Sequence, residues 1–268
     1  MLRRLPAAMP SVPFTSSPRP RALSQRSVPR TASRLAALLA AALLAATAAA
    51  APASRTPDPR DPSLSGGERV KALIERVRLA QKDIETLQAD FVQRQESAML
   101  VEPDVSRGTF SYAAPESVRW EYAAPKPISV VIDGEQMLTW YRDLKRAERL
   151  KVGRYSNQVL KYLGASGSLD TLMEYFQVRV RFPADDDDPY RIDLTPRYER
   201  VARRLAGMTV WVDPQRYLPV RLRYEAADGD VTEYEFSDFK VNAVIPAERF
   251  DLDLPAGVEV REVEIGRS

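Results

Sequence analysis

The chain has 268 residues, enough for one large or two small domains, and its 39 Lys and Arg residues nearly balance its 37 Asp and Glu residues. The net charge of +2 gives no reason to expect a nucleic-acid partner. The sequence has no Cys, which excludes disulfides and a Cys-linked lipid anchor, and no His, the usual general base and commonest metal ligand.

Residues 1–53 have the composition of a secretory signal peptide with a long n-region. Residues 1–34 are rich in Arg, Pro and Ser, and the run LAALLAAALLAATAAA follows at 35–50. A basic region, an apolar region and small residues in this order are typical of an export signal, here cleaved after Ala50 or Ala53. A permanent membrane span is the alternative, which the shortness of the Ala-rich run disfavours, and translation could also start at Met9 or later.

A Pro-rich stretch, SRTPDPRDPSLSGG at 54–67, is predicted to be a flexible linker that leads into a helix. Ser65 and Glu68 have the spacing of a capping box, which marks a helix start. One face of this helix is apolar and comprises Val70, Leu73, Ile74, Val77, Ile84 and Leu87. The other face carries charges of both signs, which favours a helix packed on a sheet over one lying on a membrane surface.

From residue 87 onward the sequence alternates between apolar and polar residues, which is typical of antiparallel strands with one buried face. The first expected strands are LQADFVQRQ, GTFSYAA, SVRWEYAA, ISVVIDG, QMLTWYRD and RAERLKV. Asp133 and Gly134 suit a hairpin turn, so the two runs on either side of them are expected to pair.

The apolar period changes after residue 152, where two short amphipathic helices are predicted at about 155–163 and 168–176. Their apolar faces comprise Tyr155, Val159, Tyr162 and Leu163 in the first, and Leu169, Leu172, Met173 and Phe176 in the second. The intervening GASG is a flexible joint. Strands resume with FQVRVRF, YRIDLTP, GMTVWVD, LPVRLRYEA, VTEYEFSDF and ERFDLDL. The pattern therefore predicts one domain, a large curved sheet interrupted midway by helices.

Two charged runs, DDDD at 185–188 and RYERVARR at 197–204, are expected to be solvated loops rather than partner-docking patches. The contiguous Asp residues lack the spaced ligands of a calcium loop, so no metal site is expected. The sequence contains no Gly-x-Ser-x-Gly elbow and no Gly-rich phosphate loop. We therefore expect neither enzyme activity nor a cofactor.

Five stretches, in this order, resemble the periplasmic outer-membrane lipoprotein carrier proteins, the LolA-like family. They are LQADFVQ, GTFSYAAPESVRWEYAAP, VVIDGEQMLTWY, DLTPR and PAERFDLDLPAGVEV. The likeness runs from about Glu68 to the end, so residues 68–268 are expected to form one LolA-like domain. The resemblance implies a mainly β fold with a helical lid (α+β), an unclosed antiparallel β-barrel or half-barrel that covers a hydrophobic cavity.

The resemblance also implies a function. Such a carrier binds the acyl chains of lipoproteins, takes them from an inner-membrane lipoprotein-releasing ABC transporter and delivers them to an outer-membrane receptor, as a periplasmic monomer without enzyme activity. The residues expected to line the cavity are Phe91, Phe110, Tyr112, Val118, Trp120, Tyr122, Val130, Ile132, Leu138, Trp140, Val159, Leu163, Leu172 and Phe176. The alternative is that the aromatic residues only fill a core beneath the helices.

The strand at 118–122 illustrates the expected division of faces. Trp120 and Tyr122 are expected to line the cavity, whereas Arg119 and Glu121 are expected to face solvent. Family members commonly carry a basic residue before the preceding Pro, where it fastens the lid, but this chain has Ala114 there. A periplasmic lipid- or lipoprotein-sensing regulatory domain of similar fold and a hydrolase of envelope lipids remain the alternative functions.

Overall fold

A computed structural model describes residues 56–115, 117–133, 136–151, 173–251 and 253–263 of the chain. All of them belong to one compact unit, Thr31–Ser268. The predicted helix at 155–163 and most of the one at 168–176 lie outside the described residues. Within the described part of the chain, no helix is both long enough and apolar enough to cross a membrane.

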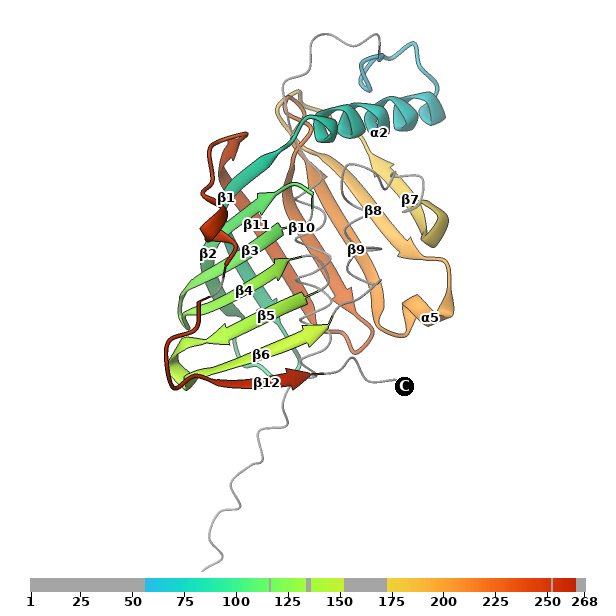
Figure 1. Ribbon diagram of the computed structural model, residues 1–268. Coiled ribbons are helices and arrows are strands. Elements are labelled where there is room, and N and C mark those ends of the chain that lie inside the picture. Colours follow the sequence, from blue (N-terminus) through green and yellow to red (C-terminus); the bar gives the residue numbers. More distant parts are fainter. Residues whose placement is uncertain (1–55, 116, 134–135, 152–172, 252, 264–268) are drawn as a thin grey trace, which may run out of the picture. The chain divides into compact units, whose positions relative to one another are not determined.

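The described elements are mostly strands (Figure 1). The helices are α2 (Gly66–Lys82), α5 (Glu199–Ala202), η1 (Arg142–Leu144) and η2 (Ala247–Arg249). The first six strands are β1 (Thr86–Glu96), β2 (Asp104–Ala113), β3 (Ser117–Ala124), β4 (Ile128–Asp133), β5 (Gln136–Tyr141) and β6 (Arg146–Lys151). The others are β7 (Phe176–Arg181), β8 (Tyr190–Pro196), β9 (Leu205–Val212), β10 (Pro219–Ala226), β11 (Val231–Val241) and β12 (Glu259–Val263).

The strands form a single sheet in the order β12-β6-β5-β4-β3-β2-β1-β11-β10-β9-β8-β7. Two antiparallel meanders, β1 to β6 and β7 to β11, join where β1 pairs with β11. The edge strands β12 and β7 do not pair with each other, so the sheet is an unclosed half-barrel, which confirms the predicted fold class. The predicted hairpin is also confirmed, because β4 and β5 pair with Asp133 opposite Gln136.

Helix α2 begins with the predicted capping box. The Glu68 amide donates to Ser65 Oγ at 3.4 Å, and the Ser65 amide donates to Glu68 Oε2 at 2.8 Å. The helix ends at Lys82, where Asn242 Nδ2 donates to the Asp83 carbonyl at 2.8 Å. The apolar face that we predicted is therefore too long, because Ile84 follows the helix and Leu87 belongs to β1.

The Pro-rich lead-in packs against the half-barrel. Arg60 pairs with Asp186 at 3.1 Å, and its guanidinium lies 5.5 Å from the centre of the Tyr190 ring. From α2, Arg69 Nε donates to the Pro59 carbonyl at 2.8 Å. Residues 56–65 thus make fixed contacts rather than forming the flexible linker that their composition predicts.

The C-terminal region differs from the prediction of a strand at 248–254. The chain forms η2 there, and the last strand, β12, lies further on and runs parallel to β6. The carbonyls of Arg249 and Asp251 accept hydrogen bonds from the Arg119 guanidinium. Hydrogen bonds from the Arg119 side chain, on β3, therefore hold this segment in place of ladder hydrogen bonds from a neighbouring strand.

Candidate lipid-binding face

The inner face of the sheet is defined here as the face that carries Trp120, and the outer face as the one that carries Arg119. In an antiparallel ladder, directly opposed residues point to the same face. Trp120 lies opposite Phe110 on β2 and Val130 on β4, and Val118 lies opposite Tyr112 and Ile132. The inner face of three adjacent strands is therefore apolar, and these side chains are at most 8% exposed.

Aromatic rings gather around Trp120, which is 0% exposed. Its ring centre lies 4.8 Å from that of Phe91 and 4.9 Å from that of Phe110. From β11, Tyr234 and Phe236 approach it to 5.2 Å and 6.0 Å. Phe91 meets Trp120 edge-on, one of the arrangements that aromatic pairs prefer. The cluster thus joins the two meanders through side chains as well as through the β1–β11 ladder.

Gly108 makes room for this cluster. It lies opposite Phe91 on one side and Tyr122 on the other. A Cβ atom at this position would lie 2.8 Å from Phe91 Cζ and would collide with the Glu121 carbonyl oxygen. Only glycine lets the Phe91 ring lie this close to the β2 backbone.

Three tyrosines place hydroxyl groups within the apolar face. Burial raises the pKa of Tyr122 to about 12, although a hydrogen bond with Tyr234 opposes this shift. Burial also raises the pKa of Tyr224 and that of Tyr234 far above the ordinary value of tyrosine. All three hydroxyls therefore stay neutral at any physiological pH, and this part of the inner face carries no charge.

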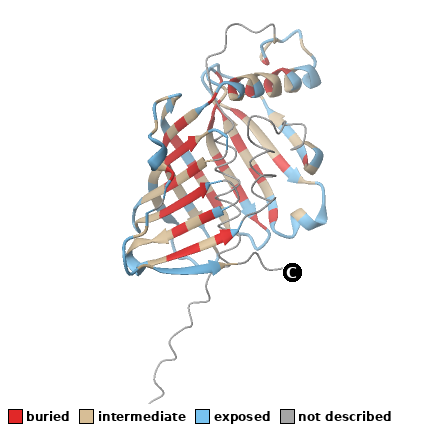
Figure 2. Ribbon diagram, viewed as in Figure 1, coloured by how far each residue is buried: buried red, intermediate tan, exposed pale blue. Residues whose placement is uncertain are grey.

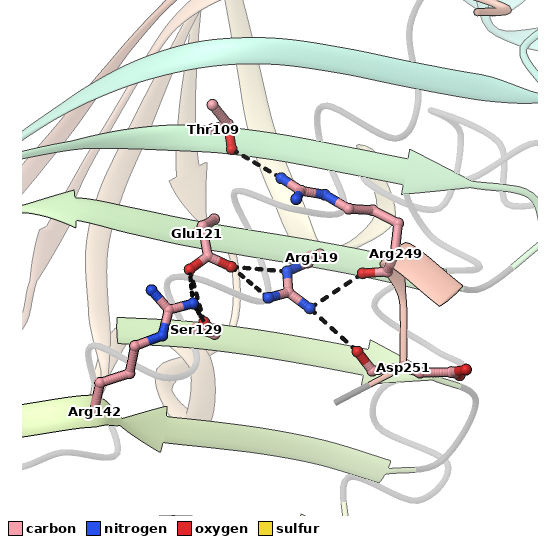
Figure 3. Close-up of polar contacts among 7 residues, drawn as sticks. All are labelled: Thr109, Arg119, Glu121, Ser129, Arg142, Arg249 and Asp251. Carbon is pink, nitrogen blue, oxygen red and sulfur yellow. Dashed lines mark hydrogen bonds and ion pairs between the residues drawn. The ribbon is translucent and has the colours of Figure 1, made fainter. Parts of the chain in front are cut away.

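The outer face of the same strands carries a polar network that we call the Glu121 network (Figure 3). Arg119 Nε donates to Glu121 Oε2 at 2.8 Å, and Ser129 Oγ donates to Glu121 Oε1 at 2.9 Å. Arg142 also pairs with Glu121 Oε1, and it donates to Ser129 Oγ at 2.8 Å. The side chains of Arg119 and Glu121 are only 11% and 17% exposed. The expectation that both face solvent is therefore wrong.

Residues 249–251, which we call the C-terminal segment, cover this network. Arg119 Nη1 donates to the carbonyls of Arg249 and Asp251 at 3.1 Å and 3.2 Å, and Arg249 Nη2 donates to Thr109 Oγ1 at 3.3 Å. Burial by itself would raise the pKa of Glu121. Hydrogen bonds from Arg119 and Ser129 and the charges of the two arginines outweigh that effect, so the pKa lies below its ordinary value.

Comparison with known proteins identifies the family. Residues 82–253, from the end of α2 to the segment after η2, match the family described as outer membrane lipoprotein carrier protein LolA. The chain belongs to the LolA family. It is 30% identical over 197 residues to an outer-membrane lipoprotein carrier protein of Alkalilimnicola ehrlichii, covering 69% of this chain and 82% of the relative. A protein of the same name from Halorhodospira halophila is 29% identical over 191 residues, covering 68% and 82%.

Solved structures of similar proteins include the LolA superfamily protein NE2245 from Nitrosomonas europaea. It has a TM-score of 0.36 and 13% identity, and the match covers 68% of this chain and 97% of that one. A second is MucB, with a TM-score of 0.44 and 14% identity over 73% of this chain and 66% of that one.

Most of the predicted cavity residues that the structure describes lie together in this LolA-family chain. The following share the inner-face cluster: Phe91, Phe110, Tyr112, Val118, Trp120, Val130 and Ile132, with Tyr122 packed against them. Phe176 also joins the cluster, but as the first residue of β7 and not as part of a lid helix. Val159, Leu163 and Leu172 lie outside the described residues.

Leu138 and Trp140 do not belong to this group. In the ladder between β4 and β5, Leu138 lies opposite Val131, and Trp140 lies opposite Ser129 of the Glu121 network. Both therefore point to the outer face, whereas Met137, which is 1% exposed, and Thr139 point to the inner face. The run QMLTWY is apolar at both parities, so the sequence alone did not distinguish its faces.

The prediction missed the contribution of β8 to β11 to the inner face. Met208, Val210, Leu222, Tyr234 and Phe236 are all buried in the same cluster. The signal was present in the alternation of VTEYEFSDF and GMTVWVD, which has the same period of two as β3.

Proposed function

We propose that this protein is a periplasmic carrier that holds the acyl chains of lipoproteins against the inner face of its half-barrel. The observation that carries the proposal is the buried aromatic inner face around Trp120, whose side chains come from both meanders of an unclosed sheet. The family description and the names of the related proteins, which refer to lipoprotein carriers, support the same reading.

The energetics of acyl chains explain why a carrier needs such a face. Transfer of acyl chain out of water stabilises by about 0.8 kcal/mol per CH₂ group, so one long chain costs on the order of 10 kcal/mol to expose. A carrier must offset this cost with apolar surface, but it must also release the chain. An apolar aromatic face meets the first need, and a sheet that stays unclosed leaves a way in and out.

The route of transport is part of the proposal. Residues 1–53 direct export and are cleaved, and the mature protein receives lipoproteins from an inner-membrane ABC transporter and passes them to an outer-membrane receptor. It acts as a monomer, without a cofactor and without catalysing a reaction. Residues at about 155–172, including Val159, Leu163 and Leu172, form a lid over the inner face, and Ala114 does not supply the basic side chain that fastens it in relatives.

The test is native mass spectrometry of protein purified from an envelope fraction. We expect wild-type protein to carry an additional mass that corresponds to an acylated protein, and the Trp120→Asp variant to lose it. Trp211→Asp is the matched control, because Trp211 lies on the outer face between Arg191 and Arg221. Since Trp120→Asp can also unfold the protein, displacement of a fluorescent acyl probe from wild-type protein by a diacylated lipopeptide is measured in parallel. Failure of the lipopeptide to displace the probe would contradict lipoprotein binding.

A further inference from the structure

A basic corner lies at the end of β8, and it consists of residues 197–204 together with Tyr175. It contains Arg197, Arg200, Arg203 and Arg204 but only one acidic residue, Glu199, and so carries a net charge of +3. The surrounding protein has the opposite sign. Residues 1–53 hold seven of the 39 Lys and Arg residues and none of the 37 Asp and Glu residues, which leaves residues 54–268 with a net charge of −5.

The corner is held in place by the sheet. Its one-turn helix α5 connects β8 to β9, where Val201 packs against the core and Ala227 donates its amide to the Arg204 carbonyl at 3.3 Å. Arg197 Nε donates to the carbonyls of Met173 and Phe176 at 3.1 Å and 2.9 Å, which ties the corner to the start of β7. The corner therefore presents its side chains from a fixed backbone.

Arginine and tyrosine side chains lie side by side on this backbone. The rings of Tyr175 and Tyr198 meet edge-on with centres 5.8 Å apart, and the Arg200 guanidinium lies 5.8 Å and 5.7 Å from them. Tyr198 is 44% exposed. Figure 2 shows α5 and its flanking residues mainly in the colour of exposed residues.

The charges of the corner are accessible to a partner. Arg203 pairs with Glu199 at 2.9 Å, but both side chains are largely exposed, and such a surface pair contributes little and leaves the guanidinium available. Arg200 and Arg204 are also exposed. This arrangement contrasts with the Glu121 network, in which the guanidinium of Arg119 is covered by its hydrogen-bond partners.

We propose that the basic corner docks on the anionic phospholipid headgroups of a membrane surface. Guanidinium groups bind phosphate oxygens through paired hydrogen bonds, and tyrosine rings are favoured at the level of the headgroups. The combination of the exposed Tyr198 ring with guanidinium groups matches a surface where phosphates lie above acyl chains. Since residues 54–268 are net negative as a whole, attraction to such a surface has to come from a local basic patch, and docking by the corner fixes the orientation of the protein on it.

This proposal concerns the outside of the half-barrel and does not depend on what the inner face binds. The corner lies at the opposite end of β8 from Tyr190, where the lead-in and α2 make their contacts (Figure 1). A docked protein would thus approach the membrane with the β8–β9 turn and keep α2 away from it.

The test is co-sedimentation of the protein with lipid vesicles. The protein is purified in the form that the cell produces, and the vesicles consist of phosphatidylcholine alone or of phosphatidylcholine with about a third phosphatidylglycerol. We expect binding only to the anionic vesicles, with weakening as salt rises. The variant Arg200→Gln/Arg203→Gln/Arg204→Gln should lower the partition coefficient on the order of a hundredfold, at about fivefold for each Arg. Arg94→Gln/Arg107→Gln/Arg179→Gln, which removes the same charge from exposed positions on other strands, should bind nearly as wild type.

Two further variants address folding and the role of the rings. Arg200→Lys/Arg203→Lys/Arg204→Lys keeps the charge and should retain most of the binding, while Tyr198→Ala should reduce it a few-fold at every salt concentration. Equal losses in the corner variant and its matched control would overturn the proposal, because net charge alone would then explain binding. Equal binding to both kinds of vesicle would also overturn it. Absence of vesicle binding, together with binding of a soluble polyglutamate peptide, would overturn the proposal as well and would point to an acidic protein partner.

Discussion

The two faces of β3 are both largely covered, but different interactions cover them. On the inner face, Val118 and Trp120 contact aromatic and aliphatic side chains of both meanders. On the outer face, Arg119 and Glu121 are enclosed by hydrogen bonds with each other, with Ser129 and Arg142, and with the carbonyls of the C-terminal segment. An alternating strand thus need not have one dry and one wet face, because a charged face can be buried when every charge finds a partner.

The largest expected effect comes from placing a charge on the inner face. Trp120→Asp removes the centre of the aromatic cluster and buries a carboxylate without a partner, which should lower the free energy of unfolding by about 4 kcal/mol. Urea denaturation measures this loss. The control Trp211→Asp, on the outer face, should cost much less, and equal losses would mean that the two faces do not differ.

The strand β5 gives the next test, because Met137 and Leu138 are neighbours on opposite faces. Met137→Ala should cost about 3 kcal/mol, since the side chain is 1% exposed within the packed inner face. Leu138→Ala should cost about 1 kcal/mol, because Leu138 is only partly buried on the outer face. The reverse order in thermal or urea denaturation would show that the register of β4 with β5 is shifted by one residue.

On the outer face, Arg119→Ala should be clearly destabilising. The substitution removes one of the two guanidinium partners of Glu121 and the donors to the Arg249 and Asp251 carbonyls, with an expected cost of about 2 kcal/mol. Arg181→Ala is the control, because Arg181 pairs with Asp193 but is 58% exposed, and its loss should change stability by less than about 0.5 kcal/mol. Similar small effects of both substitutions would show that Arg119 is solvated after all.

The contrast between the faces also shows what local sequence can predict. The alternation of Val118 and Trp120 with Arg119 and Glu121 correctly indicated a strand and its inner face, and Asp133 with Gly134 correctly indicated the hairpin. These signals are local, since period and turn chemistry depend on a few neighbouring residues. The covering of Arg119 depends on Arg249 and Asp251. These residues are separated from Arg119 by 130 and 132 positions in the sequence, so no local pattern connects them to β3.

Two other differences have similar causes. Residues 56–65 have the composition of a linker, yet Arg60 contacts Asp186 and Tyr190, which belong to the meander of β7 to β11. The contact therefore depends on the tertiary fold. The inner-face role of Tyr234 and Phe236 was predictable in principle, because β11 alternates as clearly as β3. What the alternation could not supply is that β11 lies beside β1, which brings the two rings to Trp120.

The smallest expected effect is a pH dependence that belongs to the outer face alone. The pKa of Glu121 in the folded protein lies below its ordinary value of 4.5, because the hydrogen bonds and charges of its partners outweigh burial. A carboxyl group with a lowered pKa in the folded state stabilises the protein above its unfolded pKa, and this contribution disappears as the pH falls through the folded pKa. The stability difference between wild type and Glu121→Gln should therefore be constant above about pH 5.5 and shrink as the pH falls below 4.5. Since the tyrosines of the inner face stay neutral throughout this range, Tyr122→Phe should change stability by an amount that does not vary between pH 3 and 7. Urea denaturation of the three proteins at several pH values measures both trends, and a difference for Glu121→Gln that grows as the medium becomes more acidic would contradict the lowered pKa.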